Sequence, residues 1–140
     1  MGDVKTTPLQ GGCLCGEVRY EVDAPATHRT ACHCTICRRA SAAPFVAWFS
    51  VPTNAFRLLA GEPARFSSSA HGVRTFCASC GSPLTFQSSR SPEQIDVTTC
   101  SLDTPDAAAP RDHTYVRSKL SWVVIGDGVS AYNTERTSRP

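Results

Sequence analysis

The sequence predicts a single-domain, mainly β protein made of short antiparallel strands. No stretch shows the sustained 3.6-residue apolar period of an amphipathic helix, and turn signals containing glycine or proline recur at short intervals. A chain of 140 residues is long enough to bury one hydrophobic core. We therefore expect one domain over residues 1–140, with an ordered core over about 10–135 and frayed polar ends that include residues 133–140.

Each expected strand rests on a local pattern. Residues 16–22 alternate apolar and charged side chains, as a half-buried strand does, whereas residues 45–51 are rich in aromatic and branched side chains, as a buried strand is. The expected strands cover residues 16–22, 45–51, 56–59, 64–67, 73–76, 83–87, 95–99 and 113–116.

The segments between these strands add further expectations. Residues 56–59 and 64–67 flank a Gly61-Glu62-Pro63 turn and are expected to pair as a hairpin. Residues 38–43 have room for one helical turn before a proline stops it. Residues 103–111 are bounded by prolines and indicate a surface loop. Trp48 and Trp122 lie in apolar strand-like patterns, and we expect both in the core.

Two cysteine pairs far apart in the chain predict a shared metal site. They are Cys13-Leu14-Cys15-Gly16 and Cys77-Ala78-Ser79-Cys80-Gly81, and each pair is followed by a glycine. Such pairs are good chelators and poor long-range disulfides, and the glycine lets the backbone take a positive φ and close around an ion. Four thiolates complete a structural zinc site. Buried free thiols or two local redox pairs are the alternatives.

A third cluster, Cys32-His33-Cys34-Thr35-Ile36-Cys37, holds three thiols within six residues. Three protein ligands and one open position are what a catalytic zinc needs. The alternatives are a closed site, in which Cys100 or His33 supplies the fourth ligand, and a cluster that binds no metal. An open, thiolate-bound zinc can hold an incoming thiol as thiolate or polarise a carbonyl, and either would serve the joining of a thiol to an aldehyde.

Three other residues are candidates at this site. His33 either moves a proton or acts as a spacer between two ligands. Arg38 or Arg39, which follow the cluster directly, can bind a substrate carboxylate, the alternative being solvated surface charge.

Composition limits the classes of function. The chain has 12 Arg and 2 Lys, dispersed except for one adjacent pair, so we expect no nucleic-acid partner. No run approaches the roughly 18 apolar residues of a membrane span, so we expect no membrane insertion. Residues 1–10 contain no apolar leader, and clustered cysteines suit a reducing compartment, so we expect a cytoplasmic protein.

The three cysteine motifs, in this order, resemble one known family. Residues 12–18, 32–38 and 76–82 resemble the glutathione-dependent formaldehyde-activating enzyme family, which includes centromere protein V. Residues 101–103 and 122–132 also look like this family, so the resemblance runs over nearly the whole chain.

The resemblance implies a fold, two metals and an activity. The fold would be a β-tent of antiparallel sheets. A structural zinc would bind the positions that match Cys13, Cys15, Cys77 and Cys80, and a second, labile zinc those that match Cys32, Cys34 and Cys37. The activity would be the addition of glutathione to formaldehyde, classed as a carbon–sulfur lyase. The rival hypotheses are a non-catalytic zinc module that binds a partner, and a thiol redox or metal-handling protein. An exposed apolar patch would indicate a homodimer.

Overall fold

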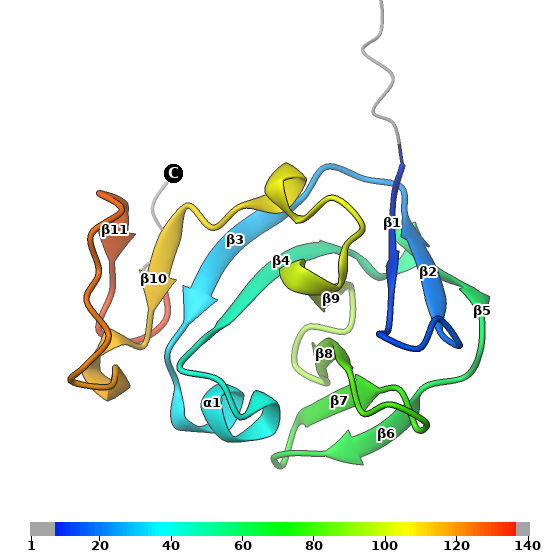
Figure 1. Ribbon diagram of the computed structural model, residues 1–140, viewed down its shortest axis with the longest axis horizontal. Helices are drawn as coiled ribbons and strands as arrows, with labels where there is room; N and C mark the ends of the chain where they lie inside the picture. Colours follow the sequence, from blue (N-terminus) through cyan, green and yellow to red (C-terminus); the bar gives the residue numbers. More distant parts are fainter. Residues whose placement is uncertain (1–7, 137–140) are drawn as a thin grey trace, which may run out of the picture.

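The computed structural model describes residues 8–136, and its strands form two sheets, as Figure 1 shows. The smaller sheet has the order β1-β2-β5, and the larger has the order β11-β10-β3-β4-β9-β8-β7-β6. The small sheet contains β1 (Leu9–Gly12), β2 (Arg19–Val22) and β5 (Phe56–Ala60). The large sheet contains β3 (Thr27–Cys32), β4 (Val46–Pro52), β6 (Ala64–Ser67), β7 (Gly72–Phe76), β8 (Pro83–Ser88), β9 (Gln94–Thr98), β10 (Asp112–Thr114) and β11 (Ser130–Ala131).

Helical structure is short and lies between strands. The α-helix α1 (Thr35–Ser41) follows β3 and precedes β4. The 3-10 turns are η1 (Thr53–Ala55), η2 (Thr99–Ser101), η3 (Pro105–Ala108) and η4 (Val116–Ser118). The mainly β prediction is confirmed. No helix among residues 8–136 is long and apolar enough to cross a membrane.

One edge of the large sheet departs from the all-antiparallel prediction. β10 pairs in parallel with β3 and with β11, while every other named strand pair is antiparallel. Parallel neighbours require a crossover connection of about a dozen residues or more. After β9, the segment from η2 to Arg111 carries the chain to the far side of β3, where β10 pairs with it.

The main core lies between the two sheets and is set by strand alternation. Successive side chains on a strand point to opposite faces, so on β4 Phe49 and Val51 enter the main core while Trp48 points to the other face. There Trp48 joins a smaller cluster with Cys32 and Cys37. The buried members of the main core are Cys13, Val18, Tyr20, Val22, Phe49, Val51, Cys77, Leu84, Ile95, Val97, Leu102 and Ala108.

The predicted hairpin between residues 56–59 and 64–67 is wrong. Both segments are strands, but β5 pairs with β2 and β6 pairs with β7, so they belong to different sheets. Gly61 lies between them with φ +77°, and a Cβ there would come within 2.3 Å of the Glu17 carbonyl oxygen. The turn is thus held against the small sheet, and the chain leaves it towards the large one.

Two expectations near the C-terminus also require correction. Trp122 is 68% exposed, outside the core, and no strand forms over residues 121–125, which connect η4 to the edge strand β11. Residues 133–136 are not frayed: the Tyr115 N–H donates to the Thr134 carbonyl at 3.0 Å, and Arg136 pairs with Asp112. Residues 1–7 and 137–140 lie outside the described part of the chain.

Candidate functional site

The two distant cysteine pairs meet in the structure. Cys13, Cys15, Cys77 and Cys80 place their sulfurs within 4.8 Å of one another, so this cluster could hold a metal ion. The Sγ atoms of Cys13 and Cys15 are 3.6 Å apart, and those of Cys15 and Cys77 are 3.7 Å apart. Cys13 and Cys15 follow β1 of the small sheet, while Cys77 and Cys80 connect β7 to β8 of the large sheet. The cluster therefore joins the two sheets.

Local backbone bonds shape both halves of this cluster. The Gly16 N–H donates to the Cys13 carbonyl at 3.2 Å, and the Gly81 N–H donates to the Cys77 carbonyl at 2.8 Å. Gly16 and Gly81 have φ of 81° and 79°, which confirms that these positions use glycine's freedom. The Leu14 N–H donates to Ser82 Oγ at 3.0 Å and ties the two halves together.

Hydrogen bonds favour the thiolate form at two positions of this cluster, Cys13 and Cys80. The backbone N–H of Val18 donates to Cys13 Sγ at 3.3 Å and lowers the pKa of that thiol. The Ser82 hydroxyl and backbone lower the pKa of Cys80 to about 5. Thiolates are the form that binds metal.

The second cluster contains Cys32, Cys34 and Cys37, whose sulfurs also lie within 4.8 Å of one another and could hold a metal ion. Cys32 ends β3, and Cys34 is the N-cap of α1, where its sulfur accepts the Cys37 N–H at 3.2 Å. Bonds from the other two thiols and from the backbone lower the pKa of Cys34. The strand end and the first helical turn thus bring the three thiols together.

This second cluster opens into a cavity of about 530 Å³. All three of its cysteines line the cavity, together with Trp48, Phe86 and Arg74. Arg74 and Phe86 are neighbours in this wall because β7 and β8 pair at these two residues. Three thiols at the wall of a cavity leave room for a small molecule beside them.

Arg74 is the cation that the sequence reasoning missed. Its Nη2 donates to Cys37 Sγ at 3.6 Å, and its Nε donates to Ser68 Oγ at 3.2 Å. Its guanidinium lies 5.0 Å from the ring centroid of Phe86 and 5.8 Å from that of Trp48. Fixed in this way, the charge stabilises thiolate at the cluster. A lone arginine in an otherwise apolar strand is the only sequence signal.

The other predicted site residues lie in different places. The His33 ring is fully buried and does not line the cysteine cavity: its Nε2 is 2.9 Å from His113 Nδ1, and His113 Nε2 is 2.7 Å from Asp127 Oδ2. This placement favours the spacer role. Cys100 is exposed and belongs to neither cluster. Arg39 lines a second cavity, and Arg38 lines none of the cavities described here.

Two residues in uncommon backbone conformations also line the first cavity. His28 and Tyr115 have φ of 46° and 56°, and Ala42 is the only other non-glycine residue among 8–136 with positive φ. Such strain in side-chain-bearing residues often accompanies functional sites. Asp96, which accepts from Ser50 Oγ at 2.6 Å, is a half-buried carboxyl of this cavity, and desolvation raises its pKa.

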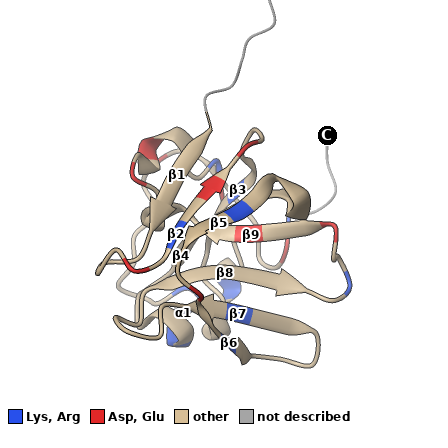
Figure 2. Cartoon of the chain, turned by 90° about the vertical axis from the view of Figure 1, so that its right-hand side faces the viewer, with Lys and Arg blue, Asp and Glu red and all other residues tan. Residues whose placement is uncertain are grey.

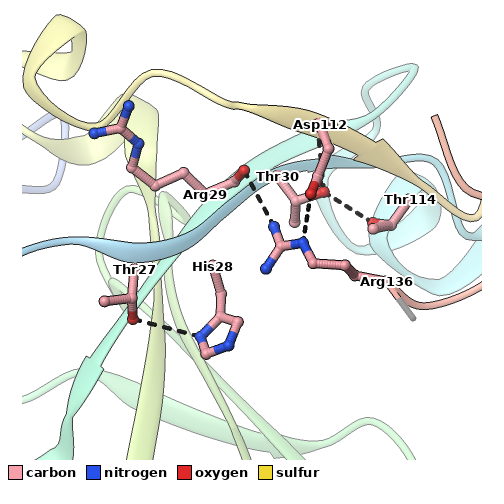
Figure 3. A network of polar contacts seen from close by, with 7 residues as sticks. All are labelled: Thr27, His28, Arg29, Thr30, Asp112, Thr114 and Arg136. Atoms are coloured by element: carbon pink, nitrogen blue, oxygen red, sulfur yellow. Dashed lines mark hydrogen bonds and ion pairs between the residues drawn. The ribbon is translucent and has the colours of Figure 1, made fainter. Parts of the chain in front are cut away.

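The C-terminal segment contributes Glu135 and Arg136 to the cavity wall. Figure 3 shows the polar contacts of Arg136. The Arg136 guanidinium pairs with the buried carboxylate of Asp112 at 2.5 Å and donates to the Arg29 carbonyl at 3.5 Å. On the face in Figure 2, Lys and Arg are interspersed with Asp and Glu rather than gathered in one stripe.

A comparison with protein families identifies the group to which the chain belongs. The family model described as glutathione-dependent formaldehyde-activating enzyme matches residues 8–118. The chain is a member of this family. The match spans all eight cysteines and Arg74, and it ends before the segment that carries Asp127 and Arg136.

Individual relatives of this family are distant. A protein of Halomonas elongata, provisionally named a glutathione-dependent formaldehyde-activating enzyme, is 28% identical over 126 residues, which cover 84% of this chain and 80% of that protein. A crystal structure of a Rhodobacter sphaeroides protein is similar with a TM-score of 0.55 and 21% identity, covering 88% of this chain and 98% of that one. This second likeness shows the fold alone.

Proposed function

We propose that this chain is a zinc-dependent carbon–sulfur lyase that joins the thiol of glutathione to formaldehyde, or splits the adduct. The observation that carries the proposal is the three-cysteine cluster at the wall of a cavity. Family membership supports the same substrates. A non-catalytic module would use a closed site with four ligands. Among residues 8–136, the second cluster contains no fourth Cys, His, Asp or Glu.

The donor sets fit zinc. A tetrahedron with zinc–sulfur bonds of about 2.3 Å has its sulfurs about 3.8 Å apart. The Sγ separations of 3.6 and 3.7 Å in the first cluster are close to that spacing. Four thiolates would form a structural site, and the three of the second cluster would leave one position for a ligand from the cavity. Bound there, zinc would supply Lewis acidity and stabilise a substrate thiol as thiolate.

The chain's own residues provide charge and proton transfer. Arg74 holds its guanidinium against the Cys37 sulfur and offsets part of the negative charge of the cluster. Asp96 lines the same cavity as the three cysteines, where it would accept the thiol proton and return it to the carbonyl oxygen, and desolvation raises the pKa of this carboxyl. In the reaction a carbon–sulfur bond forms, the carbonyl becomes a hydroxyl carrying the former thiol proton, and nothing is oxidised or reduced.

The same proposal includes the cell compartment and partners. All eight cysteines are free, which suits a glutathione-rich, reducing cytoplasm. We propose glutathione and formaldehyde as small-molecule partners, no nucleic acid and no membrane. A homodimer would cover some of the exposed apolar side chains.

The test compares wild type with Cys34→Ser and Cys100→Ser, the second being a matched control at an exposed cysteine outside both clusters. Zinc per chain is measured by elemental analysis, and exchange between glutathione, ¹³C-formaldehyde and their adduct by exchange NMR. We expect two zincs and accelerated exchange in wild type and in Cys100→Ser. Cys34→Ser is expected to keep one zinc and lose the acceleration.

Two results would contradict the proposal. One is a wild-type rate that persists in Cys34→Ser. The other is a loss of the second zinc in Cys100→Ser, which would show a closed site and favour a structural module. Reversible oxidation of the cluster on removal of the second zinc, without exchange activity, would favour a redox protein.

A further inference from the structure

A second cavity, of about 580 Å³, lies beside the cysteine cavity. Ile36, Trp48, Ser68 and Arg74 line both, so the two are neighbours across a shared wall. Ile36 lies in α1 between two cysteines of the second cluster, which places this wall next to the reacting atoms. The second cavity therefore begins beside the cysteine cavity, past the four shared side chains.

The walls of the second cavity are mainly apolar. They include three aromatic side chains, Trp48, Phe66 and Phe76, together with Val46 and Pro83. Phe66 on the edge strand β6 is 62% exposed and Ile36 is 46% exposed, although leaving large apolar side chains in water is unfavourable. Both line this cavity, so an apolar ligand there would cover them.

The charged residues of this cavity have one sign. Arg39 and Arg74 line it, and no Asp or Glu of residues 8–136 does. Both guanidiniums can stack on an aromatic face. Formaldehyde, with a single carbon and no substituent, would leave this space empty. The uncharged polar groups of this lining are the hydroxyls of Ser41, Ser68, Thr75 and Thr85, which stand between the apolar side chains.

We propose that the second cavity binds an aromatic substituent on the aldehyde carbon, so that the adduct this protein prefers comes from a thiol and an aromatic aldehyde rather than formaldehyde. This inference rests on the proposed function, since it places the adduct sulfur at the second cysteine cluster. The balanced step is unchanged: the thiol sulfur bonds to the aldehyde carbon, and the thiol proton ends on the aldehyde oxygen. The substituent on that carbon passes along the shared wall.

The test uses two stable thioethers that mimic the adducts. S-benzylglutathione carries the aromatic group, S-methylglutathione lacks it, and both are titrated into zinc-loaded protein by calorimetry. Burying a phenyl group is expected to make S-benzylglutathione bind roughly 10- to 100-fold more tightly. Equal affinities in wild type would overturn the inference.

A variant that fills the second cavity tests whether the benzyl group binds there. Ala40 is exposed on α1 and lines the second cavity but not the cysteine cavity, so Ala40→Phe adds its ring on the side of the second cavity. We expect it to abolish the preference for the benzyl group and to leave S-methylglutathione binding unchanged. Ala60→Phe on β5 makes the same change at an exposed position that lines neither cavity, and should keep the preference. A preference that survives in Ala40→Phe would overturn the inference.

Further outcomes separate this inference from the proposed function. If S-methylglutathione binds and formaldehyde exchange is accelerated, but the benzyl group adds nothing, only the inference fails. If neither thioether binds and exchange is absent, both fail. A wild-type dimer in sedimentation that becomes monomeric in Ala40→Phe would show that a second copy occupies the cavity, and would also overturn the inference.

Discussion

Replacing Cys77 with serine is expected to remove much of the stability of the folded state, because this sulfur belongs to the cluster that joins the two sheets. Cys77 is fully buried and lies between β7 and β8, while Cys13 and Cys15 follow β1 in the small sheet. Outside the cysteines, two exposed hydrogen bonds link the two halves of the cluster directly: the Leu14 N–H donates to Ser82, and the Ser79 hydroxyl donates to the Glu17 carboxylate. Each such exposed bond contributes about 1 kcal/mol.

The magnitude follows from the number of ligands. A structural zinc contributes roughly 10–16 kcal/mol of apparent binding free energy in small peptides. The whole domain is expected to be stable by only about 5–15 kcal/mol. Even if three remaining thiolates kept half of the metal's contribution, the loss would be about 5–8 kcal/mol, comparable with the total. At roughly 3–4 °C per kcal/mol for a chain of this size, the melting temperature would fall by about 15–30 °C.

The assay is thermal unfolding followed by circular dichroism, with zinc per chain measured on the same samples. Cys100→Ser is the matched control, because this exposed cysteine belongs to neither cluster, and its melting temperature should stay within about 2 °C of wild type. A Cys77→Ser protein that keeps its full zinc content and melts within about 3 °C of wild type would refute the view that this cluster holds the sheets together.

Three further predictions concern individual side chains. Arg74→Gln should weaken zinc binding at the second cluster about 10-fold, measured by chelator competition, with the first site unaffected, because the cation beside Cys37 is lost. Burial raises the pKa of Asp96 above its unfolded value, so native stability falls as pH rises from the unfolded towards the folded pKa. Asp96→Asn should therefore raise the melting temperature at pH 7 while it slows exchange, and the gain in melting temperature should shrink as the pH is lowered within the range where zinc stays bound; a gain that does not shrink would contradict this. Arg136→Met should cost about 3–5 kcal/mol in urea unfolding by leaving the buried Asp112 carboxylate unpaired, and adding Asp112→Asn should recover most of it.

The sequence was most informative about the cysteines. Their spacing predicted which thiols meet, because ligands within two or three residues of each other can bind one ion only in a few backbone conformations. The strands on either side of the Cys77 turn, β7 and β8, were also predicted, since alternation and the turn coincide there. The glycines after Cys15 and Cys80 have the positive φ that the motif requires.

The sequence was least informative where partners are distant. Whether residues 56–60 pair with β2 or with β6 depends on tertiary packing, which no local pattern records. The residues around Trp122 have the apolar and branched side chains of a strand, but no strand forms there. Arg38 and Arg39 were chosen because they follow the cluster in sequence, whereas Arg74 reaches it from 37 residues away through the register of β7 with β8.

The register in which the strands of the large sheet pair decides which side chains enter the main core and which line the cavities. On β4, Phe49 packs in the main core and Trp48 lines both cavities, so a slip of one residue would exchange core and cavity side chains. The row Phe66, Arg74 and Phe86 crosses β6, β7 and β8 on the cavity face. Its inner members are fixed by pairing on both sides, but β6 is an edge strand with one neighbour. Changes at Phe66 and on α1 can therefore alter the second cavity without disturbing the main core, because neither contributes a buried side chain to it.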